Sequence, residues 1–436
     1  MTTMVKPTGI IDRPAAADRD SADLESEVRA YSRSWPVTFT RAVGSRMYSA
    51  DGKPYLDFFM GAGALNYGHG NPLLRDPLID YVRGDGVVHS LDLMTEAKAT
   101  FLQVFGDLVL KPRAMDFKVQ FTGPTGANAV EAALKLARKV TGRPTVAAFT
   151  RSFHGMSLGA LAVTANAAKR AGAGVALDDV LRIPYEGFGR NGVCGLGLLE
   201  DLVEVSGSGV ELPAAVIVET IQGEGGVNTA STAWLQRLAA LCARTGMLLI
   251  VDDIQVGCGR TGPFFSFDDA GIVPDIVCLS KSLSGYGLPM ALTIFKRELD
   301  VWSPGEHNGT FRGSNPAFVT ATAALRAYWS DDRLRRRTEE LGGVVDSFLG
   351  ALCARHPEQG GTHRGRGLVW GLQFDDPQLA TRVSRAAFER GLLVETAGSR
   401  DEVIKLLPSL LISSEELLEG LEILRTAVDH EAGAQP

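Results

Sequence analysis

The chain has 436 residues, of which 45% are hydrophobic and 49 are glycine, and its formal net charge is −7. This length and composition are typical of a compact α/β enzyme with two domains, or with one large domain and a satellite, whereas the acidic balance argues against binding to nucleic acid. No apolar run approaches the roughly 18 residues of a membrane span, and the five scattered cysteines form no CxxC pair, so we expect a cytoplasmic protein without disulfides or a metal site.

The N-terminal part of the chain divides into a mobile segment and a group of short strands. Residues 1–22 mix charges with prolines and lack an apolar signal core, so we expect them to be mobile. Short strands are expected between Arg41 and Phe59, around the turn Asp51-Gly52-Lys53. We assign residues 23–75 to the first part of a small domain.

The middle of the chain alternates apolar strands with helices. Between two of the strands, a helix is expected from a serine N-cap at Ser231 to a closing glycine at Gly246, with apolar residues at helical spacing. Strand–helix–strand alternation implies a mostly parallel, doubly wound sheet, which we assign to a large domain of residues 76–328. The expected strands are Thr145–Phe149, Ala214–Val218, Leu248–Val251, Ile276–Leu279 and Ala291–Phe295.

The pattern changes after Asp331. A charged helix is followed by strands near Gly367–Phe374 and Val403–Leu407, and then by a helix from Ser413 onward. We assign residues 329–436 to the second part of the small domain, so that both ends of the chain form one α+β unit beside the sheet.

Polar and aromatic side chains follow four of the expected strands at the point where each strand ends. They are Phe153 and His154 after the first strand, Glu219 after the second, Asp252 after the third and Lys281 after the fourth. In open α/β sheets, ligands bind at the carboxyl ends of the strands. Four such coincidences are hard to produce by packing alone, so we place the candidate site there.

Lys281 and Asp252 form the pair that a pyridoxal phosphate (PLP) enzyme needs. A lysine amine forms a Schiff base with the cofactor aldehyde, and a carboxylate keeps the pyridine nitrogen protonated. The alternatives are a surface lysine beside a loop and an acid that caps a loop. Gln255 is expected to donate to the phenolic oxygen of the cofactor. We also expect Phe153 to stack on the cofactor ring and His154 to be a structural hydrogen-bonding partner rather than a proton shuttle.

The phosphate of such a cofactor requires backbone amides at the start of a helix. Thr125-Gly126-Ala127 leads into an alanine-rich amphipathic helix, where the glycine allows close approach, the threonine supplies a hydroxyl and the helix dipole favours the dianion. A nucleotide P-loop would need Gly-Lys-Ser/Thr here, but Asn128 and Ala129 stand in its place. An ordinary glycine-rich helix start is the other alternative.

Several motifs together resemble a known family, the class III (ornithine-type) PLP-dependent aminotransferases. The resemblance implies the PLP-dependent transferase fold of type I, in which a large domain is built on a mostly parallel, seven-stranded type of sheet and a smaller α+β domain comes from both termini. It implies that Lys281 is the Schiff-base lysine, that Asp252 binds the ring nitrogen, that Gln255 binds the ring oxygen and that Phe153 covers a ring face. The motifs are Asp51–Pro72, Phe121–Lys139, Ser152–Leu161, Glu219–Val227, Asp252–Gly262, Asp275–Ala291, His307–Ala317 and Arg364–Phe374.

The resemblance also implies an oligomer and a substrate class. The expected assembly is a homodimer or a dimer of dimers with active sites at the subunit interface, where Thr310 reaches the phosphate of the other subunit. Leu24–Ala42, Ser282–Met290 and Gly305–Gly313 are similar to members that transfer the amino group of glutamate to aspartate 4-semialdehyde, giving 2,4-diaminobutyrate and 2-oxoglutarate, in ectoine biosynthesis. Two half-reactions on one cofactor imply ping-pong kinetics.

Other functions are compatible with the same motifs. Diaminobutyrate could be made for a siderophore or an antibiotic, or the substrate could be another diamine or ω-amino acid. The same fold also supports racemases and aminomutases, which need Lys281 and Asp252 as well. A binding protein that has kept the fold without catalysis is the last alternative.

Two substrate-binding positions depart from the family pattern. Family members commonly shield an arginine with a glutamate until an α-carboxylate arrives; Glu224 matches the glutamate, but Lys405 stands at the arginine position. A second common arginine, after the aromatic-His-Gly motif, is Met156 here. Lysine offers a point charge rather than a bidentate fork, so the carboxylate contacts should differ, and Arg312 is a further candidate for them.

Overall fold

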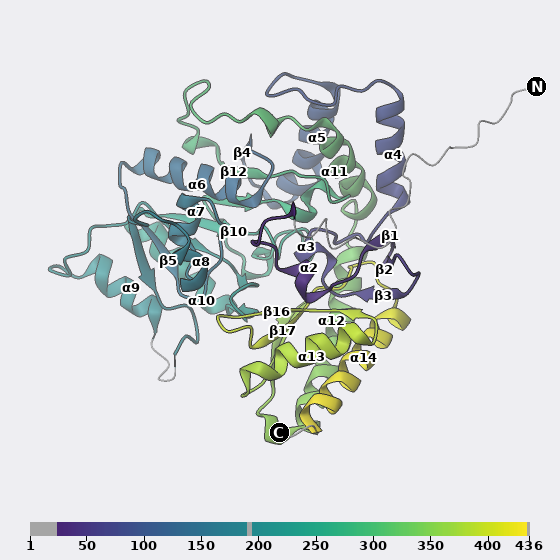
Figure 1. Cartoon of the computed structure of the whole chain (residues 1–436). Helices are drawn as coiled ribbons and strands as arrows, with labels where there is room; N and C mark the ends of the chain where they lie inside the picture. The colour runs from purple at the N-terminus through teal and green to yellow at the C-terminus, as the bar shows by residue number, and fades with distance from the viewer. Residues whose placement is uncertain (1–23, 190–193, 434–436) are drawn as a thin grey trace, which may run out of the picture.

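A seven-stranded sheet forms the centre of the molecule (Figure 1). The computed structural model describes residues 24–189 and 194–433, so the segment 1–22, which we expect to be mobile, lies outside the described residues. The strand order is β4-β12-β11-β10-β7-β5-β6. The bounds are β4 Phe117–Phe121, β5 Val146–Phe149, β6 Val180–Ile183, β7 Ala215–Val218, β10 Leu248–Asp252, β11 Ile276–Leu279 and β12 Leu292–Lys296.

The sheet is mostly parallel, which confirms the expected fold class. Neighbouring strands from β11 to β6 pair in parallel, whereas β12 runs antiparallel to both β11 and β4. All five strands expected from the sequence are present, each with bounds within a residue of those expected. The two edge strands, β4 and β6, were not predicted from the sequence.

Helices cover both faces of this sheet, so its central strands are apolar on both sides. Along β5, Val146 and Ala148 pack with the helix α6, whereas Ala147 and Phe149 pack with the opposite core, which includes α10 (Figure 1). Burial on both faces removes the alternation of polar and apolar residues that a half-exposed strand would show. The helices around the sheet are α4 Pro72–Arg83, α5 Glu96–Phe105, α6 Gly126–Thr141, α7 Leu158–Val163, α8 Ala167–Ala171, α9 Gly195–Glu204, α10 Thr232–Thr245 and α11 Asn315–Tyr328.

The helix α10 begins and ends where the sequence predicts. Ser231 is its N-cap, with a side-chain oxygen that accepts from Trp234 N at 3.2 Å. Gly246 ends the helix in the left-handed region, at φ 70°. A glycine takes up this conformation without the cost that a Cβ would add.

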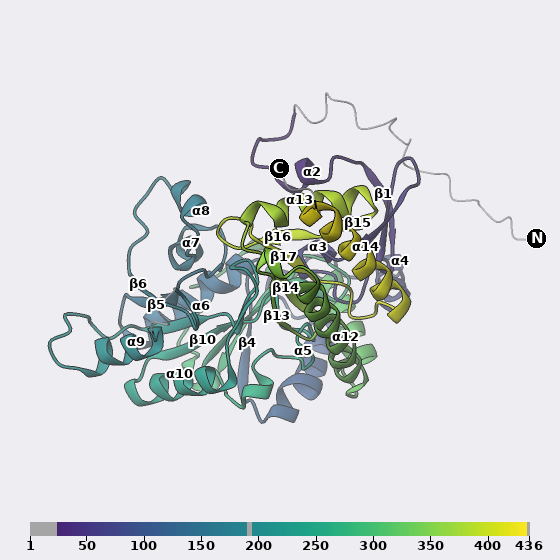
Figure 2. The same ribbon diagram turned by 90° about the horizontal axis from the view of Figure 1, so that it is seen from below.

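Both ends of the chain contribute to a second group of elements beside the sheet (Figure 2). β3 of the N-terminal part pairs in parallel with β15 of the C-terminal part, and Leu56 and Phe58 pack in one core with the C-terminal helices. The division of the chain at residues 75 and 328 stays a prediction. The strands are β1 Phe39–Val43, β2 Arg46–Ser49, β3 Pro54–Asp57, β13 Thr362–Arg366, β14 Val369–Gln373, β15 Leu392–Leu393, β16 Glu395–Ala397 and β17 Val403–Leu406.

Long helices and short turns complete the molecule. The long C-terminal helices are α12 Arg333–Arg355, α13 Pro377–Glu389 and α14 Ser414–Gly433, and no helix in the described ranges is both long and apolar enough to cross a membrane. A small hairpin is formed by β8 Ile221–Gln222 and β9 Asn228–Thr229. The remaining short elements are α2 Tyr31–Ser34, α3 Met60–Gly63, η1 Gly106–Leu110, η2 Lys111–Arg113, η3 Asp268–Ala270, η4 Lys281–Ser284, η5 Arg297–Leu299, η6 Thr310–Arg312 and η7 Pro357–Gln359.

Candidate active site

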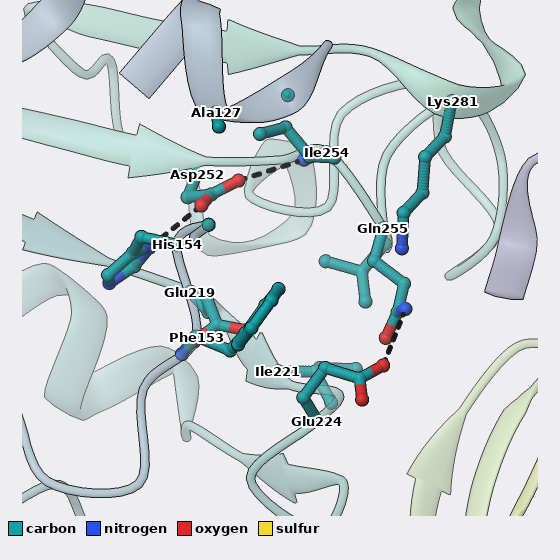
Figure 3. A pocket seen from close by; sticks show the side chains of 13 residues that line it. Ala127, Phe153, His154, Glu219, Ile221, Glu224, Asp252, Ile254, Gln255 and Lys281 are labelled. Atoms are coloured by element: carbon teal, nitrogen blue, oxygen red, sulfur yellow. Dashed lines mark hydrogen bonds and ion pairs between the residues drawn. The ribbon is translucent and has the colours of Figure 1, made fainter. Parts of the chain in front are cut away.

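A cavity of about 630 Å³, measured to its open mouth, lies at the carboxyl ends of the central strands. Figure 3 shows Asp252 and His154 on one side of it and Lys281 and Gln255 on the other, with the ring of Phe153 pointing toward the middle. The lining residues that the sequence predicts are Gly126, Ala127, Phe153, His154, Glu219, Glu224, Asp252, Gln255 and Lys281. The sequence analysis missed the others, which are Gly155, Ile221, Ile254 and Val256.

Asp252 is the last residue of β10, and two hydrogen bonds fix its buried carboxylate. Oδ2 lies 2.7 Å from His154 Nδ1, and Oδ1 accepts from Ile254 N at 3.2 Å. The backbone of His154 is held in turn, because its N–H donates to Thr164 Oγ1 at 2.9 Å. His154 therefore orients the carboxylate, as a structural partner would.

Lys281 opens η4 with a backbone φ of 50°, which is uncommon for a residue other than glycine. Its amine donates to the carbonyl oxygen of Ala62 at 2.8 Å. Desolvation in the cavity wall lowers the pKa of Lys281 to about 8, although the negative charge of Glu224 opposes this shift. About a tenth of this amine is thus neutral at pH 7, far more than for a lysine of ordinary pKa.

The carbonyl of Ala62 is a contact that the sequence analysis missed. It accepts from Gln255 Nε2 at 3.1 Å as well as from Lys281, and the backbone of Ala62 has a φ of 56°. Because this contact is made by the main chain, the side chain of Ala62 carries no signal of it. The surrounding glycines, Gly61 and Gly63, are the only trace of the unusual turn in the sequence.

Glu219 is buried at the end of β7 and holds the loop that carries Phe153. Its Oε1 accepts from Phe153 N at 2.9 Å. Burial, and then the nearby charge of Asp252, raise the pKa of Glu219 well above its usual range. Glu219 thus serves to position the loop rather than to add a second charge beside Asp252.

Lys405 lies behind Glu224 and is fully buried. Its amine pairs with Glu224 Oε1 at 2.5 Å and with Glu395 Oε1 at 3.1 Å. Glu395 faces Lys405 across the antiparallel strands β16 and β17, a partner that the sequence analysis missed. Gln255 Nε2 also donates to Glu224 Oε1, at 3.2 Å.

The charges of this cluster and its burial shift the pKa values of the two carboxyl groups in opposite directions. Burial would raise the pKa of Glu224, but the positive charges of Lys405 and Lys281 outweigh it and lower the pKa to about 2. For Glu395, burial is the larger effect and raises the pKa. Burial disfavours the charged form of Lys405, yet Glu224 and Glu395 raise its pKa above the usual value. Glu224 is thus the permanently charged partner of Lys405 on the cavity side.

The start of α6 is the place where a cradle of backbone amides for the phosphate is expected. Thr125 is the N-cap, and its hydroxyl donates to Asn128 Oδ1 at 2.9 Å. A Cβ on Gly126 would lie 2.9 Å from Ile254 Cδ1, and one on Gly155 would lie 2.8 Å from the Cβ of Ala127. Since the first amides of a helix have no acceptor within it, they are available to an anion at this end of the cavity.

Four of the predicted site residues do not line this cavity: Thr125 and Lys405, described above, lie next to it, and Thr310 and Arg312 lie away from it. Thr310 and Arg312 belong to η6, where the Thr310 carbonyl accepts from His89 Nε2 at 2.5 Å and Arg312 Nη1 donates to Asn308 Oδ1 at 3.0 Å. The expected role of Thr310 toward another subunit stays a prediction. Within the described ranges, no cluster of three potential ligands could hold a metal ion.

Comparison with known proteins places this geometry in a family of enzymes. A model of the aminotransferase class-III family matches residues 28–428, and the chain therefore belongs to this family. Class-III aminotransferases are PLP-dependent. An ornithine aminotransferase from Toxoplasma gondii, whose structure reveals partial occupancy of PLP at its active site, superposes with a TM-score of 0.81 at 27% identity over 95% of both chains.

Individual relatives are much more similar in sequence. The chain is 60% identical over 406 residues to the diaminobutyrate–2-oxoglutarate transaminase of Nocardia farcinica, and the match covers 93% of each chain. It is 59% identical over 406 residues to the protein of the same name in Streptomyces coelicolor, covering 93% of this chain and 96% of that one. The resemblance to class III aminotransferases is confirmed.

Proposed function

We propose that this protein transfers the amino group of L-glutamate to L-aspartate 4-semialdehyde, giving L-2,4-diaminobutyrate and 2-oxoglutarate, with PLP as its cofactor. The observation that carries this proposal is that the amine of Lys281 and the carboxylate of Asp252 face one cavity at the strand ends (Figure 3). The substrate choice is supported by relatives named diaminobutyrate–2-oxoglutarate transaminase at 60% and 59% identity. The reaction would be reversible, follow ping-pong kinetics and begin ectoine synthesis in the cytoplasm.

The residues around the cavity fit PLP. The amides of Gly126 and Ala127 would hold its phosphate, together with the hydroxyl of Thr125 once it has turned away from Asn128 Oδ1, and Asp252 would pair with its ring nitrogen. Gln255 Oε1 is buried without a hydrogen-bond partner within the described ranges, so its amide has an unused acceptor, and it would have to turn Nε2 from Ala62 O or Glu224 Oε1 to donate to the cofactor oxygen. When bound, PLP supplies the electron sink and the temporary carrier of the amino group.

Lys281 supplies the base of the proposed reaction. Its neutral amine would bond to the cofactor aldehyde in the resting enzyme and, once displaced by substrate, take the proton from the substrate carbon. The pKa of about 8 matches this role, because the base must be neutral at working pH. Its contact with Ala62 O at 2.8 Å keeps the amine inside the cavity.

The ion pair of Glu224 and Lys405 is proposed to allow the cavity to accept both amino donors, glutamate and diaminobutyrate, in different ways. Glutamate reacts through its α-amine, so its α-carboxylate lies near the reacting carbon and needs Lys405, from which Glu224 must move away. Diaminobutyrate reacts through its distal amine and brings no carboxylate to this position, so the pair at 2.5 Å can stay closed. Lys405 is held in either case, because Glu395 lies 3.1 Å from its amine on the other side.

The assembly is proposed to be a homodimer or a dimer of dimers, with Thr310 reaching the phosphate site of the partner subunit. Support comes from apolar side chains that are exposed around η6. Phe311 is 66% exposed and contacts His89, and the segment that carries His89 adds further exposed apolar residues. Such a patch is typical of a protein interface. These residues are Val87, Val88, Leu91, Leu93 and Met94.

A panel of amino donors tested against 2-oxoglutarate would test the proposed reaction. We expect diaminobutyrate to be the preferred donor and NMR to show that its 4-amino group has been lost. A preference for ornithine or 4-aminobutyrate would overturn the substrate. A racemase or aminomutase would act without a keto-acid acceptor, so an absolute requirement for 2-oxoglutarate separates the proposed reaction from those alternatives.

Borohydride reduction of the purified protein, followed by mass spectrometry, would test the role of Lys281. We expect the cofactor to become fixed on the peptide that contains Lys281. A protein that has kept the fold without catalysis would fix none.

A further inference from the structure

A second cavity, of about 1250 Å³ to its open mouth, adjoins the first. Its walls are the loop that follows β5, the helix α8 and the turn at Gly398 and Ser399. Phe153 and Glu224 line both cavities, so the two spaces meet across these side chains. The second cavity is therefore separated from the space beside Lys281 only by the side chains of Phe153 and Glu224.

The second cavity is lined by more positive than negative charge. Arg151, Lys169 and Arg182 contribute cations, whereas Glu224 is the one carboxylate among the described residues of the lining, and Lys405 already neutralises it. Arg182 is fully engaged by the protein, since Nη1 donates to Val163 O at 2.6 Å and Nη2 to Ala162 O at 2.8 Å. It adds charge but has little capacity to bind a ligand directly.

Lys169 is available to a ligand. Its amine lies 4.3 Å from the centroid of the Phe153 ring, and it forms no ion pair or hydrogen bond within the described ranges. The Phe153 ring lies between the two cavities, so the charge of Lys169 is held beside the boundary between them.

Arg151 is held beside the same cavity by its backbone. Its φ is 62°, and a Cβ on Gly225 would lie only 2.2 Å from its carbonyl oxygen, so the turn that carries Glu224 packs directly against it. The guanidinium lies 5.2 Å from the Phe188 centroid, and its one polar contact with the described part of the chain is a 3.5 Å approach to Asn228 Oδ1. A strained backbone position at a cavity wall is a typical mark of function.

We propose that Lys169 and Arg151 bind the carboxylate remote from the reacting carbon in five-carbon dicarboxylate substrates. This inference rests on the proposed function, in which glutamate and 2-oxoglutarate each bring two carboxylates. Lys405 serves the carboxylate next to the reacting carbon, so the other one requires a separate cation. Met156 cannot supply it, because its side chain is apolar.

The replacement Lys169→Met tests the charge separately from the packing. Methionine keeps the length of the side chain and a favourable contact with the Phe153 ring, but it removes the ammonium. We expect the Kd of glutarate, an unreactive dicarboxylate, to rise roughly ten- to a hundredfold in calorimetry of the PLP-loaded protein, since a charged contact is lost. Lys169→Arg should restore most of the affinity.

Lys53→Met is the matched control. The Lys53 amine also lies over an aromatic ring, 4.9 Å from the Tyr55 centroid, but it lines neither cavity. This variant removes the same charge and the same kind of contact elsewhere. Its affinity for glutarate should equal that of the unchanged protein.

Kinetics of the two half-reactions separate a binding role from a structural one. In Lys169→Met the KM for glutamate should rise, whereas the KM for diaminobutyrate, which has no second carboxylate, should change less than about twofold. Equal losses for both donors would show that Lys169 acts only through the Phe153 ring and would overturn the inference. An unchanged glutarate Kd would overturn it too, while glutamate turnover by the unchanged protein would show that the proposed function stands.

Discussion

Lys281 combines three properties at the scale of a single residue. It lies two residues after the end of the buried strand β11, its backbone is in the left-handed region at φ 50°, and its amine has a pKa of about 8. The first property is visible in the sequence, but the other two depend on the cavity around it. The carbonyl of Ala62 and the charge of Glu224 come from segments far away in the chain.

The lowered pKa of Lys281 predicts how cofactor loading depends on pH. Only the neutral amine can attack the PLP aldehyde, and the neutral fraction grows as pH rises toward the pKa. The rate of PLP uptake by the apoprotein should rise about tenfold per pH unit below about pH 8 and level off above it. Stopped-flow absorbance of apoprotein mixed with PLP measures this profile.

The variant Glu224→Gln is a control, because it should shift the midpoint of the pH profile in a known direction. Glu224 raises the pKa of Lys281, so its loss should move the midpoint of the loading profile to lower pH. A midpoint near 10.5, the ordinary value for lysine, would contradict the desolvated environment described for this amine.

Gly126 carries a second prediction at the residue scale. A Cβ there would lie 2.9 Å from Ile254 Cδ1, at the point where the amides must approach the phosphate. Gly126→Ala should therefore weaken PLP binding at least about tenfold in equilibrium titration, because the cradle has to shift. Gly106→Ala is the control, since a Cβ at Gly106 meets no atom within 4 Å, and its PLP affinity should be unchanged.

At the scale of elements, two adjacent glycines in α12 show how packing decides the effect of a residue. A Cβ on Gly342 would lie 2.5 Å from the carbonyl oxygen of Gly367, whereas a Cβ on Gly343 would meet nothing within 4 Å. Gly343→Ala should raise the free energy of unfolding by about 0.5–1 kcal/mol, because alanine is the better helix former.

Gly342→Ala should have the opposite sign. The new methyl group must push α12 away from the turn at Gly367. Because this movement costs more than the gain in helix propensity, the free energy of unfolding should fall by about 1–3 kcal/mol. Thermal and urea unfolding of the two variants measure both effects. Equal stabilities for the two variants would contradict the close packing of α12 on this turn.

The sequence predicts some elements well because their own residues decide them. β5, β7, β10 and β11 are continuous apolar runs, and a strand covered on both faces requires such a run wherever it lies. The edge strands β4 and β6 carry polar residues such as Lys118 and Arg182, so no apolar run marks them. β15 has only two residues, and its pairing with β3, rather than its own sequence, makes it a strand.

The residues of β12 do not indicate its direction either, because an apolar run looks the same in a parallel and in an antiparallel strand. The connection from β11 contains the short 3-10 turn η4 but no α-helix, whereas a parallel strand is usually reached through a helical crossover. For the site, Asp252 and Lys281 could be predicted because strand ends meet at one edge. Glu395 could not, because its approach to Lys405 depends on the register of β16 against β17.

At the scale of the whole molecule, the cavity joins elements from distant parts of the chain. Lys281 opens η4, Ala62 belongs to α3 and Lys405 to β17, and each is connected to the cavity by hydrogen bonds or ion pairs. A ligand that binds the folded cavity but not the unfolded chain stabilises all of these elements together. The stability of the protein should thus depend on its cofactor.

Removal of PLP should therefore lower the Tm of the protein by several degrees. Lys281→Ala with added PLP should give an intermediate Tm, because the phosphate and ring contacts remain while the covalent bond is lost. Differential scanning calorimetry of the holoprotein, the apoprotein and this variant tests the expectation. Identical Tm values with and without PLP would contradict it.

The pairing of β3 with β15 affects how the nascent chain folds during translation. Leu56 lies opposite Leu392 in the strand pair, and its N–H donates to Gly391 O at 2.8 Å, so the apolar surface of the first strands lacks its C-terminal cover until most of the chain has been translated. At a translation rate of about 5–20 residues per second, that surface stays uncovered for tens of seconds. The central sheet can form during this delay, while the emerging N-terminal strands are a natural target for chaperones.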